Sequence, residues 1–351
     1  MSRSLGMVIR IATRSLLIAV LGGAFAASAA AQSAEDFYKS HAVLTLGVPA
    51  DVGGTYDTYT RLLGRYLPKY LPGSPSVIVQ NNSAAGGLVL ANKAYNSAPK
   101  DGTFIAMVRG STIQEQVSGR SAAMFDGRKF AWIGNMNMEY ESCIVMQDSP
   151  IRSLSDLYNQ EVIVGASGVG AQSFSFPLVY NALLHMKFKV IAGYKSTPDR
   201  YLAMERGELS GNCGIDTSVI EATFFNQYRE GKIRVILQAA MHKDQRFSDV
   251  PNILDEAKTV ADRQALEYMF AGLELGRPFA APGETPKDRI ALLRHAFAQA
   301  MTDPGLVQEA KRLQLDIDWM DGEASASAVG RLYATPHAAM ERVRAVLNAN
   351  P

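Results

Sequence analysis

One local pattern occurs twice in this chain: an apolar strand runs into a glycine-rich turn, and the turn opens an amphipathic helix. The first copy spans 43–54, with a helix expected from Thr55. The second spans 162–170, with a helix expected from Gln172. Such turns expose backbone N–H groups beside the positive end of a helix dipole, which favours anion binding. Two of them, roughly a hundred residues apart, predict two lobes that hold one small anion between them.

The first 31 residues have the layout of a secretory signal peptide. Arg3, Arg10 and Arg14 precede an apolar stretch, which ends in the small residues 27–31. The stretch contains glycine and is short for a membrane span, and no lipobox cysteine follows it. We therefore expect cleavage after Ala31 and a secreted, periplasmic mature protein.

Composition limits the function of the remaining chain. Its length of about 320 residues is long for one hydrophobic core and suits two domains. Without Arg3, Arg10 and Arg14, the 35 Lys and Arg of the full sequence fall to 32 against 34 Asp and Glu, so no basic excess supports nucleic-acid binding. The histidines are scattered, and neither a zinc spacing nor a dinucleotide or P-loop motif occurs, so we expect no metal and no cofactor.

The two cysteines, Cys143 and Cys213, leave two alternatives open. In an oxidising compartment they can pair as a disulfide. Otherwise they are buried free thiols, because the sequence does not show whether their Cα atoms come close enough for a bridge.

Strand and helix patterns alternate along the chain, which favours an α/β fold with parallel sheets. We assign residues 32–140 and 233–351 to a first lobe and residues 141–232 to a second lobe. The apolar strand 233–237 is interpreted as the return into the first lobe. The chain then crosses between the lobes twice, and two crossings form a hinge that lets the lobes close on a ligand.

Several side chains near the turns are candidates for ligand contact. Tyr56 lies inside the first turn, where a core role is hard to build. Arg109 and Ser111 follow an apolar strand, at the end of the strand where α/β proteins bind ligands. Arg109 either pairs with a ligand carboxylate or is a surface arginine. Residues 165–169 resemble the G-x-S-x-G elbow of hydrolases, with Val169 in place of the last glycine, so a secreted hydrolase using Ser167 is an alternative.

The chain resembles the periplasmic solute-binding proteins of tripartite tricarboxylate transporters, also called the Bug family, over nearly its whole mature length. The stretches that carry the resemblance are 53–61, 83–87, 99–102, 167–170, 193–196, 281–286 and 303–304. The resemblance implies a two-lobe Venus flytrap that binds a small organic carboxylate without catalysis and delivers it to membrane transporter subunits. We expect a monomer and a di- or tricarboxylate or an aromatic acid as ligand. A sensing subunit for a membrane receptor is a further alternative, with the same fold and a different partner.

The resemblance also implies where the ligand lies. Backbone N–H groups of the two turns are expected to hold a ligand carboxylate, often through ordered waters. Carried over to this sequence, the contacts are Val52, Gly53, Gly54, Thr55, Tyr56 and Asp57 on one side and Ser167, Gly168, Val169, Gly170 and Ala171 on the other. Tyr194 and the 212–216 segment, which ends in Asp216, are expected to flank the cleft.

Overall fold

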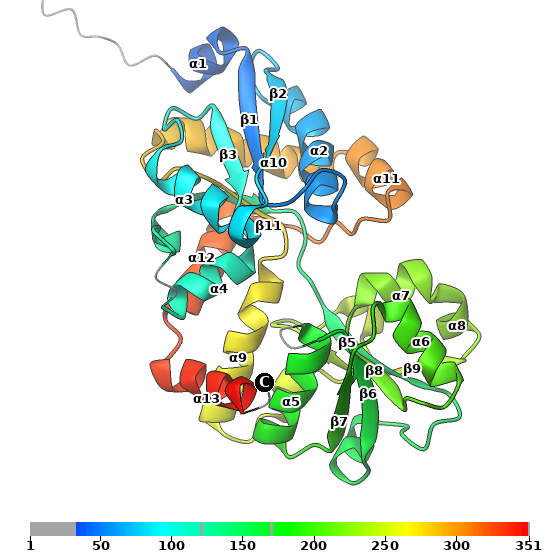
Figure 1. The fold of residues 1–351 in the computed structure, drawn as a ribbon. Coiled ribbons are helices and arrows are strands. Elements are labelled where there is room, and N and C mark those ends of the chain that lie inside the picture. Colours follow the sequence, from blue (N-terminus) through cyan, green and yellow to red (C-terminus); the bar gives the residue numbers. More distant parts are fainter. Residues whose placement is uncertain (1–32, 120–121, 169–170, 350–351) are drawn as a thin grey trace, which may run out of the picture.

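The computed structural model describes residues 33–119, 122–168 and 171–349. The predicted signal peptide, and Val169 and Gly170 of the second turn, lie outside the described residues. The described chain forms two lobes, each built around its own sheet (Figure 1). This confirms the predicted two-lobe α/β architecture.

The sheet of the first lobe has six strands in the order β11–β4–β10–β3–β1–β2. Its first three strands in the sequence run parallel to one another, and β10 runs antiparallel between β3 and β4. The strands are β1 (Val43–Val48), β2 (Ser76–Asn81), β3 (Phe104–Met107), β4 (Ala131–Asn135), β10 (Pro278–Ala281) and β11 (Met320–Asp321).

Helices cover both faces of this sheet. One face packs against α1 (Ala34–Ser40), α2 (Thr55–Tyr66), α10 (Lys287–Thr302) and α11 (Pro304–Arg312). The other face packs against α3 (Leu88–Asn96), α4 (Gly110–Val117) and α12 (Gly322–Tyr333). In α2, Tyr59, Leu62, Leu63 and Tyr66 are buried at the spacing that puts them on one face of a helix, as the sequence predicts.

The sheet of the second lobe has five strands in the order β7–β6–β8–β5–β9. They are β5 (Glu141–Met146), β6 (Val162–Ala166), β7 (Phe188–Ala192), β8 (Gly211–Asp216) and β9 (Ile233–Ala239). Helix α5 (Gln172–Leu184) covers one face. Helices α6 (Thr197–Glu205) and α7 (Thr217–Thr223) cover the other face, and α8 (Phe225–Arg229) follows them.

Strand β9 corrects the predicted lobe boundary. The sequence analysis places 233–237 in the first lobe, and this is wrong, because β9 pairs antiparallel with β5 in the second sheet. The chain returns to the first sheet only at β10. An apolar run indicates a strand but not the sheet that the strand joins, so the local pattern did not contain this information.

Helix α9 (Val260–Glu274) lies between the lobes and packs on both (Figure 1). Leu266 and Phe270 belong to the core of the second lobe, whereas Ala271 belongs to the core beneath α3, α4 and α12. The C-terminal helix α13 (His337–Asn348) packs on α9 and α5, and its Val343 is buried in the core of the second lobe. The lobes are therefore joined by packed helices as well as by connecting chain.

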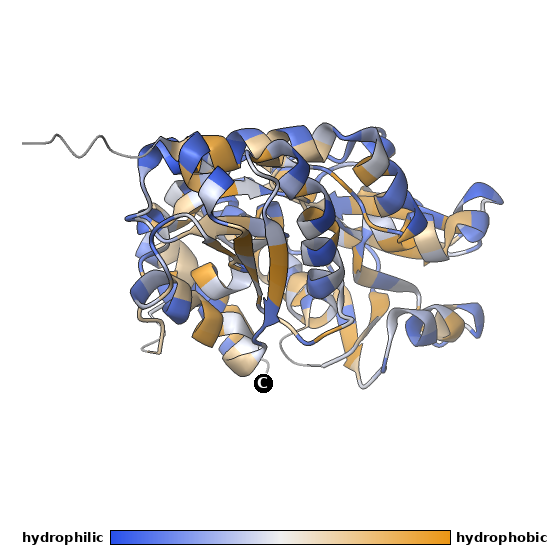
Figure 2. Cartoon of the chain, turned by 90° about the horizontal axis from the view of Figure 1, so that it is seen from above, coloured by the Kyte–Doolittle hydropathy of each residue, from blue (hydrophilic) through white to orange (hydrophobic). Residues whose placement is uncertain are grey.

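Short 3₁₀ helices occupy several connections: η1 (Leu67–Tyr70), η2 (Ala84–Gly87), η3 (Gly127–Lys129), η4 (Leu154–Tyr158), η5 (Gln245–Phe247) and η6 (Ile253–Glu256). Hydrophobic residues are concentrated on the strands, and the helices carry hydrophilic residues on their outer sides (Figure 2). Among the described helices, none combines the length and apolar character needed to cross a membrane.

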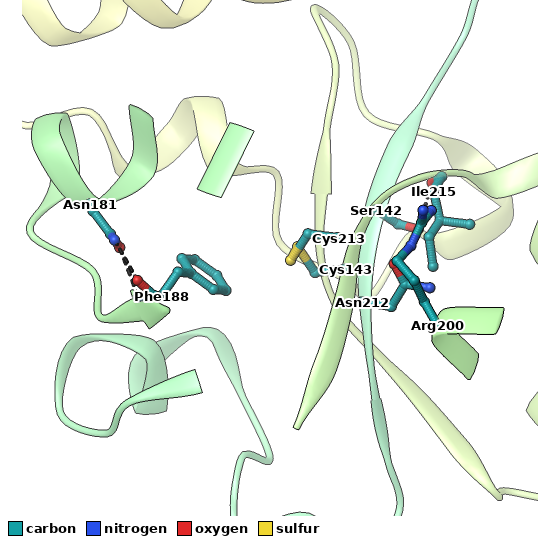
Figure 3. The surroundings of a disulfide bond; sticks show 8 residues. All are labelled: Ser142, Cys143, Asn181, Phe188, Arg200, Asn212, Cys213 and Ile215. Atoms are coloured by element: carbon teal, nitrogen blue, oxygen red, sulfur yellow. Dashed lines mark hydrogen bonds between the residues drawn. A yellow bond between two sulfur atoms is a disulfide. The ribbon is translucent and has the colours of Figure 1, made fainter. Parts of the chain in front are cut away.

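Cys143 in β5 and Cys213 in β8 form a disulfide, with their Cα atoms 4.0 Å apart (Figure 3). The two residues are direct neighbours across the antiparallel strand pair, and both are buried. Of the two alternatives that the sequence leaves open, the structure has the disulfide.

Candidate ligand-binding site

A cavity of about 820 Å³ lies between the two lobes. Its volume falls within the roughly 300–1,000 Å³ that is usual for small-molecule sites. Both lobes supply residues to its wall, together with α9 and α13. Five of the predicted contact residues lie in the wall: Tyr56, Arg109, Ser111, Ser167 and Ala171.

The other described candidates are not among the residues that line this cavity: Val52, Gly53, Gly54, Thr55, Asp57, Gly168, Tyr194 and Asp216. Val52 is 72% exposed at the tip of the first turn. Tyr194 packs against the core under α6 and α7, and its N–H group donates to the carbonyl of Ala166. Asp216 caps α7, since its carboxylate accepts from the N–H group of Ser218 at 2.8 Å.

Asp57 organises the first turn. Its carboxylate is buried and accepts hydrogen bonds from Gly53 N (2.8 Å), Arg61 Nε (2.9 Å) and Asn81 Nδ2 (3.0 Å). Burial by itself would raise the pKa of Asp57, but these hydrogen bonds and the charge of Arg61 outweigh burial and lower the pKa. We therefore place Asp57 in the scaffold of the turn, with its oxygens already occupied.

Tyr56 connects the first turn to two arginines. The Cζ atoms of Arg109 and Arg277 lie 4.8 Å and 4.4 Å from the centroid of its ring. Arg277 is buried, and its Nη1 pairs with Glu139 Oε1 at 2.5 Å. Burial lowers the pKa of Arg277, but attraction to Glu139 outweighs burial and raises it. Arg277 therefore has its counter-ion within the protein and fixes the position of the Tyr56 ring.

Arg109 is the first of two cavity arginines that form no ion pair with a carboxylate of the described residues. It precedes α4, and its Nη1 donates to the carbonyl of Gly86 at 3.2 Å. Its Nε is buried and has no hydrogen-bond partner among the described residues. Next to it, Gly110 is required, because a Cβ there would lie 2.5 Å from the carbonyl oxygen of Gly272 in α9. This close approach of α4 and α9 fixes the backbone from which Arg109 extends.

Arg200 of α6 is the second such arginine, and the sequence analysis missed it. It is 3% exposed and donates from Nε to Asn212 Oδ1 (2.7 Å), from Nη1 to Ser167 Oγ (2.8 Å) and from Nη2 to Thr197 Oγ1 (2.8 Å). All three acceptors are neutral oxygens. Figure 3 shows Arg200 beside Asn212, on the side of the strands opposite the disulfide. Burial lowers the pKa of Arg200, yet an arginine guanidinium stays charged in proteins.

A sequence signal for Arg200 does exist. It lies three and four residues before Ala203 and Met204, which are both buried on the inner face of α6. An arginine on the buried face of a short helix is unusual, because charged side chains are seldom fully buried.

Glu141 lies near Arg200 but does not pair with it. Burial raises the pKa of Glu141 well above its ordinary value, and repulsion from Asp216 and Glu139 adds to this effect. Arg200 attracts Glu141 and Asp199 electrostatically, but its described side-chain hydrogen bonds all go to neutral oxygens.

The apolar part of the cavity wall also comes from residues outside the two glycine-rich turns. It comes from the two helices between the lobes and from α5, and comprises Phe176, Met269, Leu273, Met340, Val343 and Leu347. Among the described residues, no group of histidine, cysteine and acidic side chains is arranged to hold a metal ion.

Comparison with known proteins supports this architecture. A family model described as the NMT1-like family matches residues 50–264. No curated protein matches the sequence. A TctC solute-binding protein from Polaromonas has a TM-score of 0.68 and 18% identity, with 87% of this chain and 98% of that one covered.

Two further solved structures have the same fold. R. palustris Rpa4515 with adipate has a TM-score of 0.54 and 16% identity, and the periplasmic binding protein BugD has 0.52 and 19%. Both alignments cover 87% of this chain and 97% of the other. At such identities the similarity establishes the fold, which is the Venus flytrap predicted from the sequence. Since the family model covers more than half of the sequence, the chain belongs to the NMT1-like family and has the fold of TctC and Bug solute-binding proteins.

Proposed function

We propose that this protein is an extracytoplasmic solute-binding protein that captures a small organic carboxylate and delivers it to the membrane subunits of a tripartite tricarboxylate-type transporter. The observation that carries the proposal is the cavity between the lobes, into which Arg109 and Arg200 bring charges that form no ion pair with a described carboxylate. Burying a carboxylate is costly unless it is fully hydrogen-bonded, and a guanidinium is a well-matched donor.

Two further observations support the proposal. The R. palustris Rpa4515 structure, which shares the fold, contains adipate, a small organic carboxylate. The first 31 residues have the composition of a signal peptide, which suits a periplasmic protein that acts beside a membrane transporter.

Capture works through the relative position of the lobes. Because each lobe supplies part of the cavity wall, an arrangement that brings the lobes together gives the ligand contacts that a separated arrangement does not. A ligand shifts the equilibrium between the two arrangements only by the difference in its affinity for them.

A hydrolase mechanism at Ser167 has less support. Its hydroxyl oxygen accepts a hydrogen bond from Nη1 of Arg200 at 2.8 Å. A general base must accept the proton of the serine, and a guanidinium has no acceptor. This contact favours binding over catalysis. A sensing subunit would use the same cavity and differ only in its membrane partner.

A ligand screen tests the proposal. The mature protein, unfolded and refolded to remove carried-over ligand, is heated with mono-, di- and tricarboxylates and with their uncharged amides. A ligand present at about 100 times its Kd stabilises the protein by about 2.7 kcal/mol. We expect a shift with one class of carboxylate and none with its amide. Equal behaviour of acids and amides, or no shift in folded protein, would overturn the proposal.

A further inference from the structure

We propose that Arg109 and Arg200 are the specificity-determining residues of the cavity, and that the ligand is a dicarboxylate which places one carboxylate on each of them. The inference rests on the proposed function, which by itself needs only one carboxylate. The two arginines come from different lobes, so such a ligand connects the lobes through its own two ends.

Arg200 is prepared to receive an anion. A guanidinium has five N–H groups, and hydrogen bonds to Asn212, Ser167 and Thr197 use three of them. One N–H group on Nη1 and one on Nη2 remain, which suits the two oxygens of a carboxylate. The three neutral acceptors fix the plane of the guanidinium without neutralising it. Since a buried charge is costly without a close ion partner, and no described carboxylate forms an ion pair with Arg200, this arrangement favours a counter-ion from outside the protein.

Arg109 is the corresponding cation of the first lobe. Of its five N–H groups, the one described hydrogen bond, to the carbonyl of Gly86, occupies a single group. The Tyr56 ring lies against the guanidinium and holds it in the cavity wall. The Tyr56 ring is in turn positioned by Arg277 and packs against the core of the first lobe. Arg109 is therefore held by a side chain that the core itself fixes.

The other charged residues of the wall have partners. Glu139 pairs with Arg277, and Arg344 pairs with Glu341 at 2.7 Å and donates to the carbonyl of Ser118 at 2.9 Å. Glu115 is also not free. Within the described part of the wall, Arg109 and Arg200 are therefore the two arginines without a carboxylate in ion-pair contact. A monocarboxylate would pair with one of them and leave the other without an anionic partner, whereas a dicarboxylate pairs with both.

The remaining wall fits the linker between two carboxylates. Phe176, Met269 and Leu273 contribute apolar side chains from α5 and α9. Apolar surface of this kind gains free energy by covering methylene groups. The apolar side chains of the wall thus favour a diacid with a hydrocarbon chain over one in which every carbon carries a hydroxyl.

The test removes one charge from the ligand, by amidation, and one charge from the protein, by substitution of an arginine, and compares the two losses of affinity. Isothermal titration calorimetry compares succinate, glutarate and adipate with butyrate and hexanoate, and then the best diacid with its half-amide. In the unaltered protein, we expect the half-amide to bind about 100-fold more weakly than the diacid. In Arg109→Gln or Arg200→Gln, the diacid should lose a similar factor, and the half-amide should bind within threefold of the diacid.

The change in the affinity ratio of diacid to half-amide separates ligand contact from a structural role. A loss of folding would weaken the binding of both ligands equally and keep this ratio at about 100. Arg200→Lys keeps the charge and should recover part of the affinity if Arg200→Gln fails to fold. Arg263→Gln removes an exposed arginine of α9 outside the cavity wall and should leave both affinities unchanged.

The outcomes are distinct. Monocarboxylates that bind as well as diacids, or a half-amide as tight as the diacid in the unaltered protein, would overturn the two-carboxylate inference and leave the solute-binding function standing. Failure of every carboxylate to bind the folded, unaltered protein would overturn both.

Discussion

Arg246 of the second lobe and Asp316 of the first lobe form an ion pair, with 2.6 Å between Nη1 and Oδ2. Within its own lobe the same guanidinium also pairs with Asp244 and Glu221, each at 2.8 Å. Neither Arg246 nor Asp316 lines the ligand cavity, so this contact links the lobes at a separate place.

Asp316→Asn is expected to widen the distribution of lobe separations. The pair is about 30% exposed, at 31% and 29% for the two side chains, and a pair of this kind contributes about 1 kcal/mol. Small-angle X-ray scattering of ligand-free protein should give a larger radius of gyration for the variant, and salt should have the same effect on the unaltered protein. Glu267→Gln breaks the Arg263 pair inside α9 and serves as the control. Superimposable scattering curves would contradict the assigned role of the pair.

Gly214→Ala should destabilise the second lobe far more than Gly231→Ala. Both glycines have positive φ, +67° and +69°, so both variants carry a left-handed strain of about 1–2 kcal/mol. At Gly214 a Cβ would also lie 2.5 Å from the backbone N of Ser173, whereas nothing lies within 4 Å of one at Gly231. Urea denaturation measures the difference, which we expect to exceed about 2 kcal/mol. Equal losses would show that α5 can shift to accept the methyl group.

Asp216→Asn is expected to change how stability depends on pH. Burial raises the pKa of Asp216 to about 6, against an opposing hydrogen bond from Ser218, and repulsion from Glu139 adds to the rise. The folded state therefore holds this proton more tightly than the unfolded state, whose pKa is about 3.9. The resulting stabilisation is present below about pH 4 and is lost as the pH rises through about 6.

Asparagine keeps the cap on α7 but has no proton to lose. Compared with the unaltered protein, the variant should therefore gain stability between pH 4.5 and pH 7.5 in urea denaturation. Parallel stability curves for the two proteins would rule out the titration of Asp216 in this range.

The Cys143→Ala/Cys213→Ala double variant should lose stability in the second lobe. The disulfide closes a loop with a sequence separation of 70, and restricting the unfolded chain in this way stabilises by about 4 kcal/mol. Hydrogen exchange should show reduced protection of β5 and β8 and unchanged protection of β1 and β3. Reduction of the unaltered protein should reproduce the effect, and a loss below about 1 kcal/mol would disagree with the chain-entropy account.

Much of the fold follows from local sequence patterns. The glycine turns, the helices beginning at Thr55 and Gln172, and the strands on either side of them lie where periodicity predicts. The partner of β9 does not follow, because an apolar strand fits the edge of either sheet. Helix α9 was also missed, since its two apolar faces serve two different cores and blur the one-sided periodicity of a surface helix.

The site was predicted less completely than the fold. Tyr56, Arg109 and Ser167 follow from the turns and from the rule that α/β proteins bind ligands at strand ends. Asp57 illustrates the limit of that reasoning. A carboxylate beside a glycine-rich turn can accept hydrogen bonds from the backbone of the turn, as Asp57 does from Gly53, and then takes no part in ligand binding. Arg200 reaches the cavity from the far side of the second sheet, and tertiary packing alone brings it to Ser167.

The packing of α9 also limits how the lobes can move. A flytrap joined only by extended strands closes by bending at those strands, with both cores left intact. Here Phe270 belongs to one core and Ala271 to the next, so closure must slide α9 against at least one of them. The motion then has shear as well as hinge character. Interdigitated side chains allow a few discrete positions rather than a continuum, so ligand capture in this protein would proceed as a switch between set arrangements.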